Sequence, residues 1–276
     1  MRRRVGMPCR CTSTVEEAVM KKRIVWGLGL MMLVGMILPG WVGAGGIDRV
    51  KKAGVLRVGS DITYPPFEVM QAGKPVGFDV DMAQEIAKAL GVKLEYVNTA
   101  WDGIFAALKA GKFDMLLSGI SITEERMKSY DLVFSEPYFL SGQGVAVRVG
   151  DTRIKTAADL KGKLVGVQIN TTGQAAAEKV AGVKEIKKYE QLPEAYADLK
   201  AKRLDAVVAD YPVIVANAKE DKKFAPVKGL QIGEPEKLGI PVRKEDADLI
   251  TVVNKVIADL KKSGKYDQVR KKWFGE

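Results

Sequence analysis

The chain has 276 residues, of which 47% are hydrophobic and 28% are charged. This composition excludes intrinsic disorder, collagen and a coiled coil, and the length suffices for one large hydrophobic core or two ordinary ones. The net charge of +10 would favour nucleic acid or a membrane surface as partner if it lay on the folded part. Residues 1–44 carry half of it, and the remaining 37 basic and 32 acidic side chains are ordinary for a surface, so we expect no nucleic-acid partner.

Histidine is absent from the chain, and both cysteines, Cys9 and Cys11, lie within the first 44 residues. The rest of the chain therefore lacks the groups for Ser-His or Cys-His nucleophilic pairs, thiolate chemistry, and zinc or iron sites with His or Cys ligands. Carboxylates, lysines and arginines remain. We expect no metal, no cofactor and no catalytic residue.

The first 44 residues have the pattern of a secretory signal peptide. Basic residues 21–23 precede an apolar run at 24–38, and small residues at 42–44 suit cleavage after Ala44. The alternative is a membrane anchor, but fifteen residues at about 1.5 Å each fall short of a hydrocarbon core of roughly 30 Å. Met20, directly before the basic residues, is predicted as the initiator. We therefore predict a periplasmic or extracellular protein.

From Val55 onward, short apolar runs alternate with amphipathic segments, which predicts an α/β fold with mostly parallel sheets. Strands are predicted at 56–60, 94–97, 115–117, 145–148, 164–167 and 206–209. Helical spacing of apolar residues runs from Val80 to Leu90, with Asp79 and Asp81 as candidate N-caps and Gly91 as the stop. Further helices are predicted around 104–108 and 249–260.

Two passages, at 138–144 and 229–241, bracket the middle of the chain, and the first could be a crossing between domains or a hinge. The first is rich in Gly and Ser, and the second in Gly and Pro. Their positions suit one domain inserted into another.

Several motifs, in this order along the chain, resemble the periplasmic amino-acid-binding proteins of ABC importers (solute-binding protein family 3). This family includes the lysine/arginine/ornithine-, histidine- and glutamine-binding proteins. The motifs are VGSD at 58–61 with YPPFE at 64–68, GFDVD at 77–81, SGISITEER at 118–126, FSEPY at 134–138, GVQ at 166–168 with TTG at 171–173, and DA at 205–206 with Asp210.

The resemblance implies the type II periplasmic-binding-protein fold, with two α/β lobes joined by two crossover strands and the ligand in the cleft. After the leader at 1–44, residues 45–141 and 238–276 would form lobe 1, and 142–237 would form lobe 2. The implied function is capture of a polar L-amino acid and its delivery to a membrane ABC permease. We expect a non-catalytic monomer.

A free amino acid presents a carboxylate and an ammonium, and a closed cleft must pair both. The resemblance implies that Arg126 clamps the carboxylate bidentately, supported by Ser121 and by Thr171 and Thr172 at a helix start. From the residues alone, a solvated helix residue paired with Glu125 or Asp131 is the favoured interpretation of Arg126, and only its position in the family motif reverses this preference. The Thr pair alone would be a plain N-cap.

The ammonium would be taken by Asp210, with Ser118 and the carbonyl of Gly119 completing its shell, as the resemblance implies. Asp210 follows an apolar strand and precedes Tyr211-Pro212, so without the resemblance it reads equally as a helix cap.

The ligand side chain would meet Asp61, Tyr64, Trp101 and Gln168, which match the pocket positions of the family. Aromatic faces favour a guanidinium and Asp61 could pair with it, so we favour arginine or another basic amino acid. Asp61 also fits glutamine binders, and the alternative role for it is to shape its turn. Asn170 departs from the glycine usual in the family. Asn tolerates positive φ, and its amide could enter the pocket.

The alternative function is an enzyme on the same fold, because cyclohexadienyl (arogenate/prephenate) dehydratases share the GFDVDMA and SGISI stretches. That reaction needs a general acid over the leaving hydroxyl. The acidic residue that the dehydratases carry a few positions beyond Asp210 is replaced here by apolar Val213. The receptor is therefore the preferred hypothesis.

Overall fold

The structure is a computed structural model, which describes residues 45–275. Contacts divide the chain into Met1–Val42 and Gly43–Glu276, and the description below concerns the second unit. The predicted leader, its cleavage after Ala44, Met20 and both cysteines lie outside the described residues.

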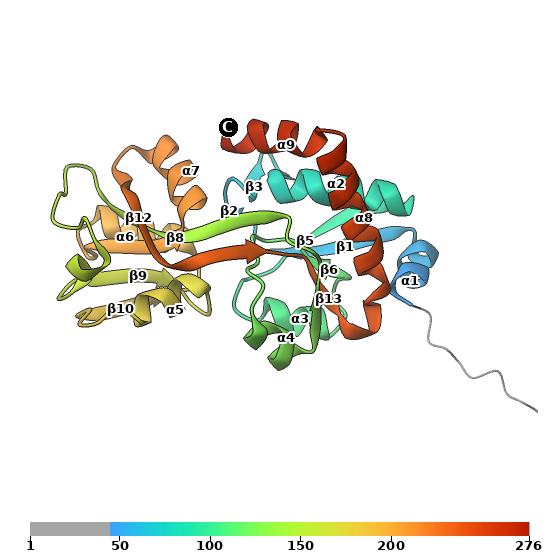
Figure 1. The fold of residues 1–276 in the computed structure, drawn as a ribbon, viewed down its shortest axis with the longest axis horizontal. Helices are drawn as coiled ribbons and strands as arrows, with labels where there is room; N and C mark the ends of the chain where they lie inside the picture. The colour runs from blue at the N-terminus through green and yellow to red at the C-terminus, as the bar shows by residue number, and fades with distance from the viewer. Residues whose placement is uncertain (1–44, 276) are drawn as a thin grey trace, which may run out of the picture. The chain divides into compact units, whose positions relative to one another are not determined.

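The first five-stranded sheet has the order β5-β1-β6-β13-β7 (Figure 1). β1 is parallel to both β5 and β6, whereas β13 is antiparallel to β6 and β7. A small antiparallel sheet of β2, β3 and β4 follows β1 in the chain. The strands are β1 (Val55–Ser60), β2 (Thr63–Tyr64), β3 (Glu68–Gln71), β4 (Lys74–Val76), β5 (Lys93–Asn98), β6 (Met115–Leu116), β7 (Leu132–Phe134) and β13 (Pro241–Arg243).

The second five-stranded sheet has the order β10-β9-β11-β8-β12, with the first three strands parallel and the last two antiparallel to their neighbours. Every residue of β11 is buried, as expected for a central strand covered by helices on both faces. The strands are β8 (Phe139–Arg148), β9 (Leu164–Gln168), β10 (Glu185–Tyr189), β11 (Ala206–Asp210) and β12 (Phe224–Leu238).

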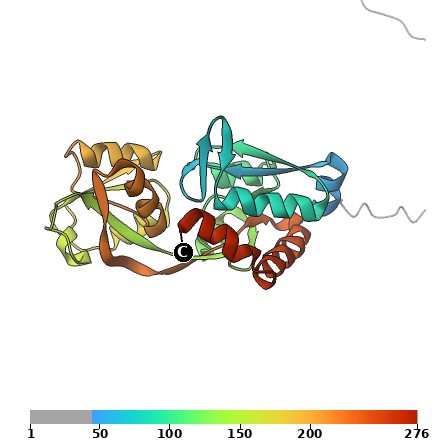
Figure 2. The same ribbon diagram turned by 90° about the horizontal axis from the view of Figure 1, so that it is seen from above.

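The predicted two-lobed α/β architecture is confirmed, with one five-stranded sheet in each lobe. The prediction of mostly parallel sheets is wrong, because each of these sheets has two parallel and two antiparallel pairings. β8 and β12 run side by side from one group of elements to the other (Figures 1 and 2). The boundaries at 141/142 and 237/238 stay a prediction. All six predicted strands are present, in β1, β5, β6, β8, β9 and β11.

Helices cover the sheets, and their apolar faces supply much of the core. Val253 and Leu249 of α8, for example, are completely buried. No helix within 45–275 combines the length and apolarity of a membrane span. The helices are α1 (Gly46–Ala53), α2 (Phe78–Leu90), α3 (Ile104–Lys109), α4 (Glu124–Tyr130), α5 (Thr172–Glu178), α6 (Leu192–Lys200), α7 (Tyr211–Asp221), α8 (Asp248–Lys262) and α9 (Lys265–Phe274), with 3₁₀ turns at Ala157–Leu160 and Lys244–Asp246.

The start of α2 differs from the prediction. Gly77 is the N-cap, and neither Asp79 nor Asp81 caps the helix. Gly77 has φ 149°, and a Cβ there would lie 1.9 Å from the carbonyl oxygen of Phe67, so only glycine fits. The side chain of Asp79 turns into the interior instead. The predicted end of the helix is confirmed, because Gly91 is the left-handed C-cap.

Candidate functional site

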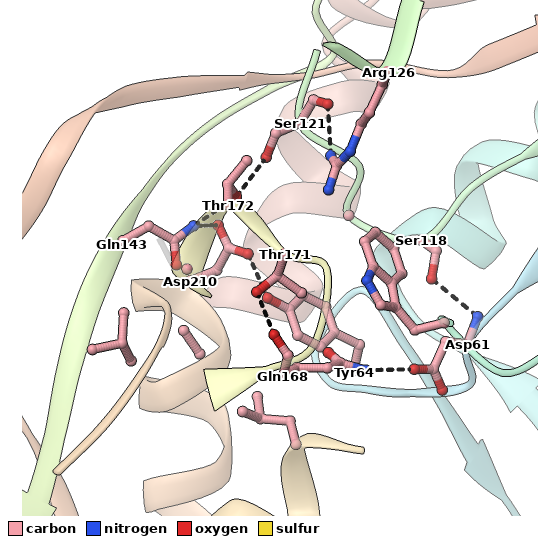
Figure 3. Close-up of a pocket in the computed structure, with 16 residues that line it drawn as sticks. Asp61, Tyr64, Ser118, Ser121, Arg126, Gln143, Gln168, Thr171, Thr172 and Asp210 are labelled. Carbon is pink, nitrogen blue, oxygen red and sulfur yellow. Dashed lines mark hydrogen bonds between the residues drawn. The ribbon is translucent and has the colours of Figure 1, made fainter. Parts of the chain in front are cut away.

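A pocket lies at the ends of β1, β6, β9 and β11, close to β8 and β12, the two strands that cross between the lobes (Figure 3). Its space free of protein atoms, the adjoining open solvent included, is about 440 Å³. Eleven of the twelve predicted ligand residues line it: Asp61, Tyr64, Trp101, Ser118, Gly119, Ser121, Arg126, Gln168, Thr171, Thr172 and Asp210.

Asn170 is the exception. It adopts the positive φ expected of it, 57°, but its side-chain amide donates to Asp102 Oδ1 at 2.8 Å and does not line the pocket. Its carbonyl accepts a hydrogen bond of 3.3 Å from Nε1 of Trp101, which does line the pocket. The amide is held by an exposed carboxylate, which corrects the expectation that it enters the pocket.

Arg126 is positioned by the start of α4. Thr123 caps this helix by accepting from the main-chain nitrogen of Arg126 at 3.1 Å. The guanidinium donates to the carbonyl of Ser121 at 2.8 Å and lies 5.3 Å from the Trp101 ring centre. The residue is only 7% exposed, and burial lowers the pKa of its guanidinium.

Arg126 has no ion-pair partner among residues 45–275. Asp131, one of the two partners considered from sequence, pairs with Lys244 at 3.5 Å instead. The Arg126 guanidinium is therefore a buried cation beside a pocket, and none of the carboxylates within 45–275 whose charges act on it forms a salt bridge with it. A buried charge is costly unless it is paired, so this arrangement favours binding of an anionic group.

Asp210 occupies the N-cap position of α7, but its side chain makes no cap hydrogen bond. Its carboxylate accepts from the hydroxyl of Tyr64, from Ser141 Oγ at 2.5 Å and from Gln143 Nε2 at 3.4 Å. Burial raises the pKa of Asp210 to about 6, although the first two of these hydrogen bonds act to lower it. The carboxylate is thus aimed into the pocket and surrounded by neutral donors.

Asp61 lies at the opposite end of the pocket from Ser121 (Figure 3). Its Oδ2 accepts from Gln168 Nε2 at 2.9 Å, and its Oδ1 from Thr63 Oγ1 at 2.8 Å. Burial raises the pKa of Asp61, and these two hydrogen bonds act to lower it. The main-chain nitrogen of Asp61 donates to Ser118 Oγ at 3.0 Å, which fixes the turn after β1.

Two buried carboxyl groups support the pocket wall from behind. Ser118 Oγ donates to Glu68 at 2.7 Å, and the main-chain nitrogen of Gly119 donates to Asp79 at 2.9 Å. Burial raises the pKa of Asp79 to about 6 and that of Glu68 well above its ordinary value. The motif residues Glu68 and Asp79 therefore hold Ser118 and Gly119 in place without lining the pocket.

Thr171 and Thr172 begin α5. Thr171 is an N-cap, as the simpler interpretation had it, because its hydroxyl accepts from the nitrogen of Gln174 at 3.1 Å. Thr172 extends its hydroxyl toward Ser121, with 3.4 Å between the two oxygens. The two hydroxyls come from elements attached to different sheets, so they meet across the cleft.

Sequence reasoning missed several residues at the site. Gln143 of β8 lines the pocket, together with Gly173, Leu192, Val208 and Ala209. Glu236 of β12 bonds to three pocket residues, although it lies outside the lining itself. Gln143 falls in the Gly/Ser-rich passage at 138–144 and Glu236 in the Gly/Pro-rich passage at 229–241, and a polar residue within such a passage was the only available signal. Within 45–275 no acidic cluster is arranged to hold a metal ion.

The sequence pattern of the family described as bacterial extracellular solute-binding proteins, family 3, matches residues 56–276. The L-cystine-binding protein TcyJ of Escherichia coli strain K12 is 36% identical, and the match covers 90% of this chain and 93% of that protein. A crystal structure of a mutant of ArgBP from T. maritima is 42% identical with a TM-score of 0.77, covering 84% of this chain and all of that one. The ancestral amino acid-binding protein AncCDT-1, a precursor of cyclohexadienyl dehydratase, is 40% identical with a TM-score of 0.77 and the same coverage.

Proposed function

Since the chain belongs to the bacterial extracellular solute-binding proteins of family 3, we propose that it is a receptor that holds one polar L-amino acid between its lobes and delivers it to an ABC permease. L-arginine is the favoured ligand. The proposal includes the predicted lobe boundaries, a monomeric state and export with removal of the leader.

The buried, unpaired guanidinium of Arg126 is the observation that carries this proposal. A ligand carboxylate beside it would receive two parallel N–H donors, which is the strongest pairing that a carboxylate finds in proteins. Ser121 and Thr172 lie next to this position and would complete the carboxylate subsite. The family position of Arg126 in SGISITEER supports the same role.

The ammonium group of the ligand would lie against Asp210. This carboxylate is buried and accepts only from neutral groups, so an ammonium would supply the missing charge. Ser118 and the carbonyl of Gly119 border the same space. Arg126 and Asp210 together would then select the zwitterionic end that is common to free amino acids.

The ligand side chain would extend toward Asp61 and Gln168, past Tyr64 and Trp101. Asp61 is the acidic group at this end and forms no ion pair within 45–275, which favours a basic side chain. The names of the relatives extend the candidates to cystine, because TcyJ is named as an L-cystine-binding protein. Cystine and arginine are both long enough to carry a polar group to this end of the pocket.

Isothermal calorimetry with the refolded full chain, freed of copurified ligand, tests the proposal. The panel is the twenty amino acids with cystine, ornithine and citrulline, together with arogenate and prephenate. Tight binding of a basic amino acid supports the receptor and the charge pairing at Asp61. Preference for glutamine or cystine keeps the receptor and removes the charge pairing. Consumption of arogenate or prephenate without amino-acid binding overturns the receptor in favour of the dehydratase.

A further inference from the structure

Glu236 reaches the pocket region through the pairing of the two crossing strands. On β8, Ser141 and Gln143 are two residues apart, so their side chains project from the same face, and both bond to Asp210. Glu236 lies directly opposite Ser141 on β12 and therefore shares this face. An irregularity between Ile232 and Glu236 adds two residues to β12 without changing the face on which Glu236 emerges.

The carboxylate of Glu236 contacts hydroxyls from both lobes. Its Oε2 accepts from Ser121 Oγ and from Thr172 Oγ1, the latter at 2.8 Å, and its Oε1 accepts from Gln143 Nε2 at 3.2 Å. Ser121 follows β6 of the first sheet, whereas Thr172 begins α5 beside the second. Figure 3 shows these two hydroxyls turned toward each other beside Gln143. One carboxylate oxygen thus joins the two walls of the cleft.

This geometry makes the hydrogen bonding of Glu236 depend on closure. If the lobes separate, Ser121 and Thr172 move apart, and one oxygen on β12 no longer reaches both hydroxyls. Hydrogen bonds to a charged acceptor are stronger than those between neutral groups, so the closed arrangement gains more from Glu236 than an open one. A contact made only in the closed state shifts the population toward that state.

We propose that Glu236 is a latch between the lobes, which holds the cleft closed over its ligand and slows ligand release. The role in ligand release rests on the proposed receptor function. Glu236 acts here as a positioning residue, through Ser121 and Thr172. Its negative charge also lies near Arg126, where it would repel a ligand carboxylate. Removing the charge would therefore weaken ligand binding if the latch dominates and strengthen it if this repulsion dominates.

The first test compares Glu236→Gln with Glu234→Gln in the full chain. Glu234 is exposed on the same strand, so both variants remove one negative charge. With L-arginine and L-cystine as probes, we expect Glu236→Gln to dissociate at least fivefold faster and Glu234→Gln to stay within twofold of the original protein. In a Thr172→Val background, Glu236→Gln should change the rate by less than twofold, because the shared contact is already lost.

The second test needs no ligand. Spin labels are attached to Lys128→Cys and Lys179→Cys, at exposed positions on α4 and at the end of α5, after both native cysteines are replaced by serine. We expect Glu236→Gln to move the interlobe distance distribution to longer values than Glu234→Gln does.

Equal distance distributions for the two variants, or tighter probe binding by Glu236→Gln, would overturn the latch. If the original protein binds neither probe nor any amino acid of the panel, the receptor proposal fails, while the distance measurement still decides the latch.

Discussion

Gln168 Nε2 donates a hydrogen bond of 2.9 Å to Asp61 Oδ2 and so connects the end of β9 to the turn after β1. The same nitrogen donates to the carbonyl of Glu190 at 3.0 Å, which fixes the amide with its NH₂ group toward Asp61. Asp61 is 4% exposed and receives only neutral donors. A cationic ligand side chain at this position would therefore pair with a carboxylate that already accepts hydrogen bonds from both lobes.

We expect Asp61→Asn to weaken L-arginine binding at least tenfold at pH 7.5 and to change L-glutamine binding less than threefold. The amide keeps the shape of the turn but cannot neutralise a guanidinium. Calorimetry with both ligands measures the difference, and Asp102→Asn, which removes an exposed carboxylate near the cleft, is the matched control. Equal losses for the two ligands would show that Asp61 shapes its turn and does not pair with the ligand.

The strands and most of the site residues could be predicted from sequence because their signals are local. Apolar runs such as 206–209 mark buried central strands, and Asp210 follows directly from its position at the end of one. The order of the motifs then placed Arg126 and Thr172 in one site although 46 positions separate them in the chain. The structure brings both to the same pocket.

The contacts that the sequence did not predict depend on pairing between segments far apart in the chain. Asp79 was predicted as an N-cap of α2. The N-cap is instead Gly77, which lies close to the carbonyl of Phe67, and the Asp79 carboxylate accepts a hydrogen bond from the buried main-chain nitrogen of Gly119. Glu236 reaches Thr172 only because β12 pairs with β8 and gains two residues on the way. No local pattern in the chain encodes either contact.

We expect Arg126→Ala to weaken binding of the best amino-acid ligand at least 100-fold, because a buried ligand carboxylate would lose its bidentate partner. Arg126→Lys keeps the charge without the fork of donors, so its affinity should lie between those of the original protein and Arg126→Ala. Calorimetry measures both. A loss below tenfold for Arg126→Ala would contradict the assignment of the carboxylate subsite. Circular dichroism of the variant checks that the fold is retained.

Gly77→Ala should destabilise the protein by about 3 kcal/mol or more, because the new Cβ meets the carbonyl of Phe67 and the backbone must move. Gly73→Ala is the control: Gly73 also has positive φ, 76°, but has no atom within 4 Å of the added Cβ. It should cost about 1 kcal/mol. Urea unfolding followed by circular dichroism compares the two. Equal unfolding midpoints would show that the close approach of Gly77 to Phe67 does not exclude a larger residue at position 77.

Ligand affinity should fall as the pH is lowered through about 6. Burial raises the pKa of Asp210 to about 6, so at pH 5 most molecules carry a protonated Asp210, which must lose its proton before it can pair with a ligand ammonium. One such linked proton predicts affinity roughly tenfold lower at pH 5 than at pH 7.5. Among the neighbouring groups, Tyr64 and Tyr196 have raised pKa values and stay neutral, and Arg126 stays charged over this range.

Calorimetry of the best amino-acid ligand from pH 5 to pH 8 measures this dependence, with Asp210→Asn as the decisive comparison. The variant should bind at least tenfold more weakly at pH 7.5 and lose most of the pH dependence, because the amide cannot titrate. Glu236→Gln separates the contribution of the neighbouring carboxylate, which raises the pKa of Asp210 through its charge. A pH profile of Asp210→Asn as steep as that of the original protein would place the linked proton elsewhere, on Asp61 or on the buried pair Glu68 and Asp79 behind the pocket wall, whose pKa values burial also raises.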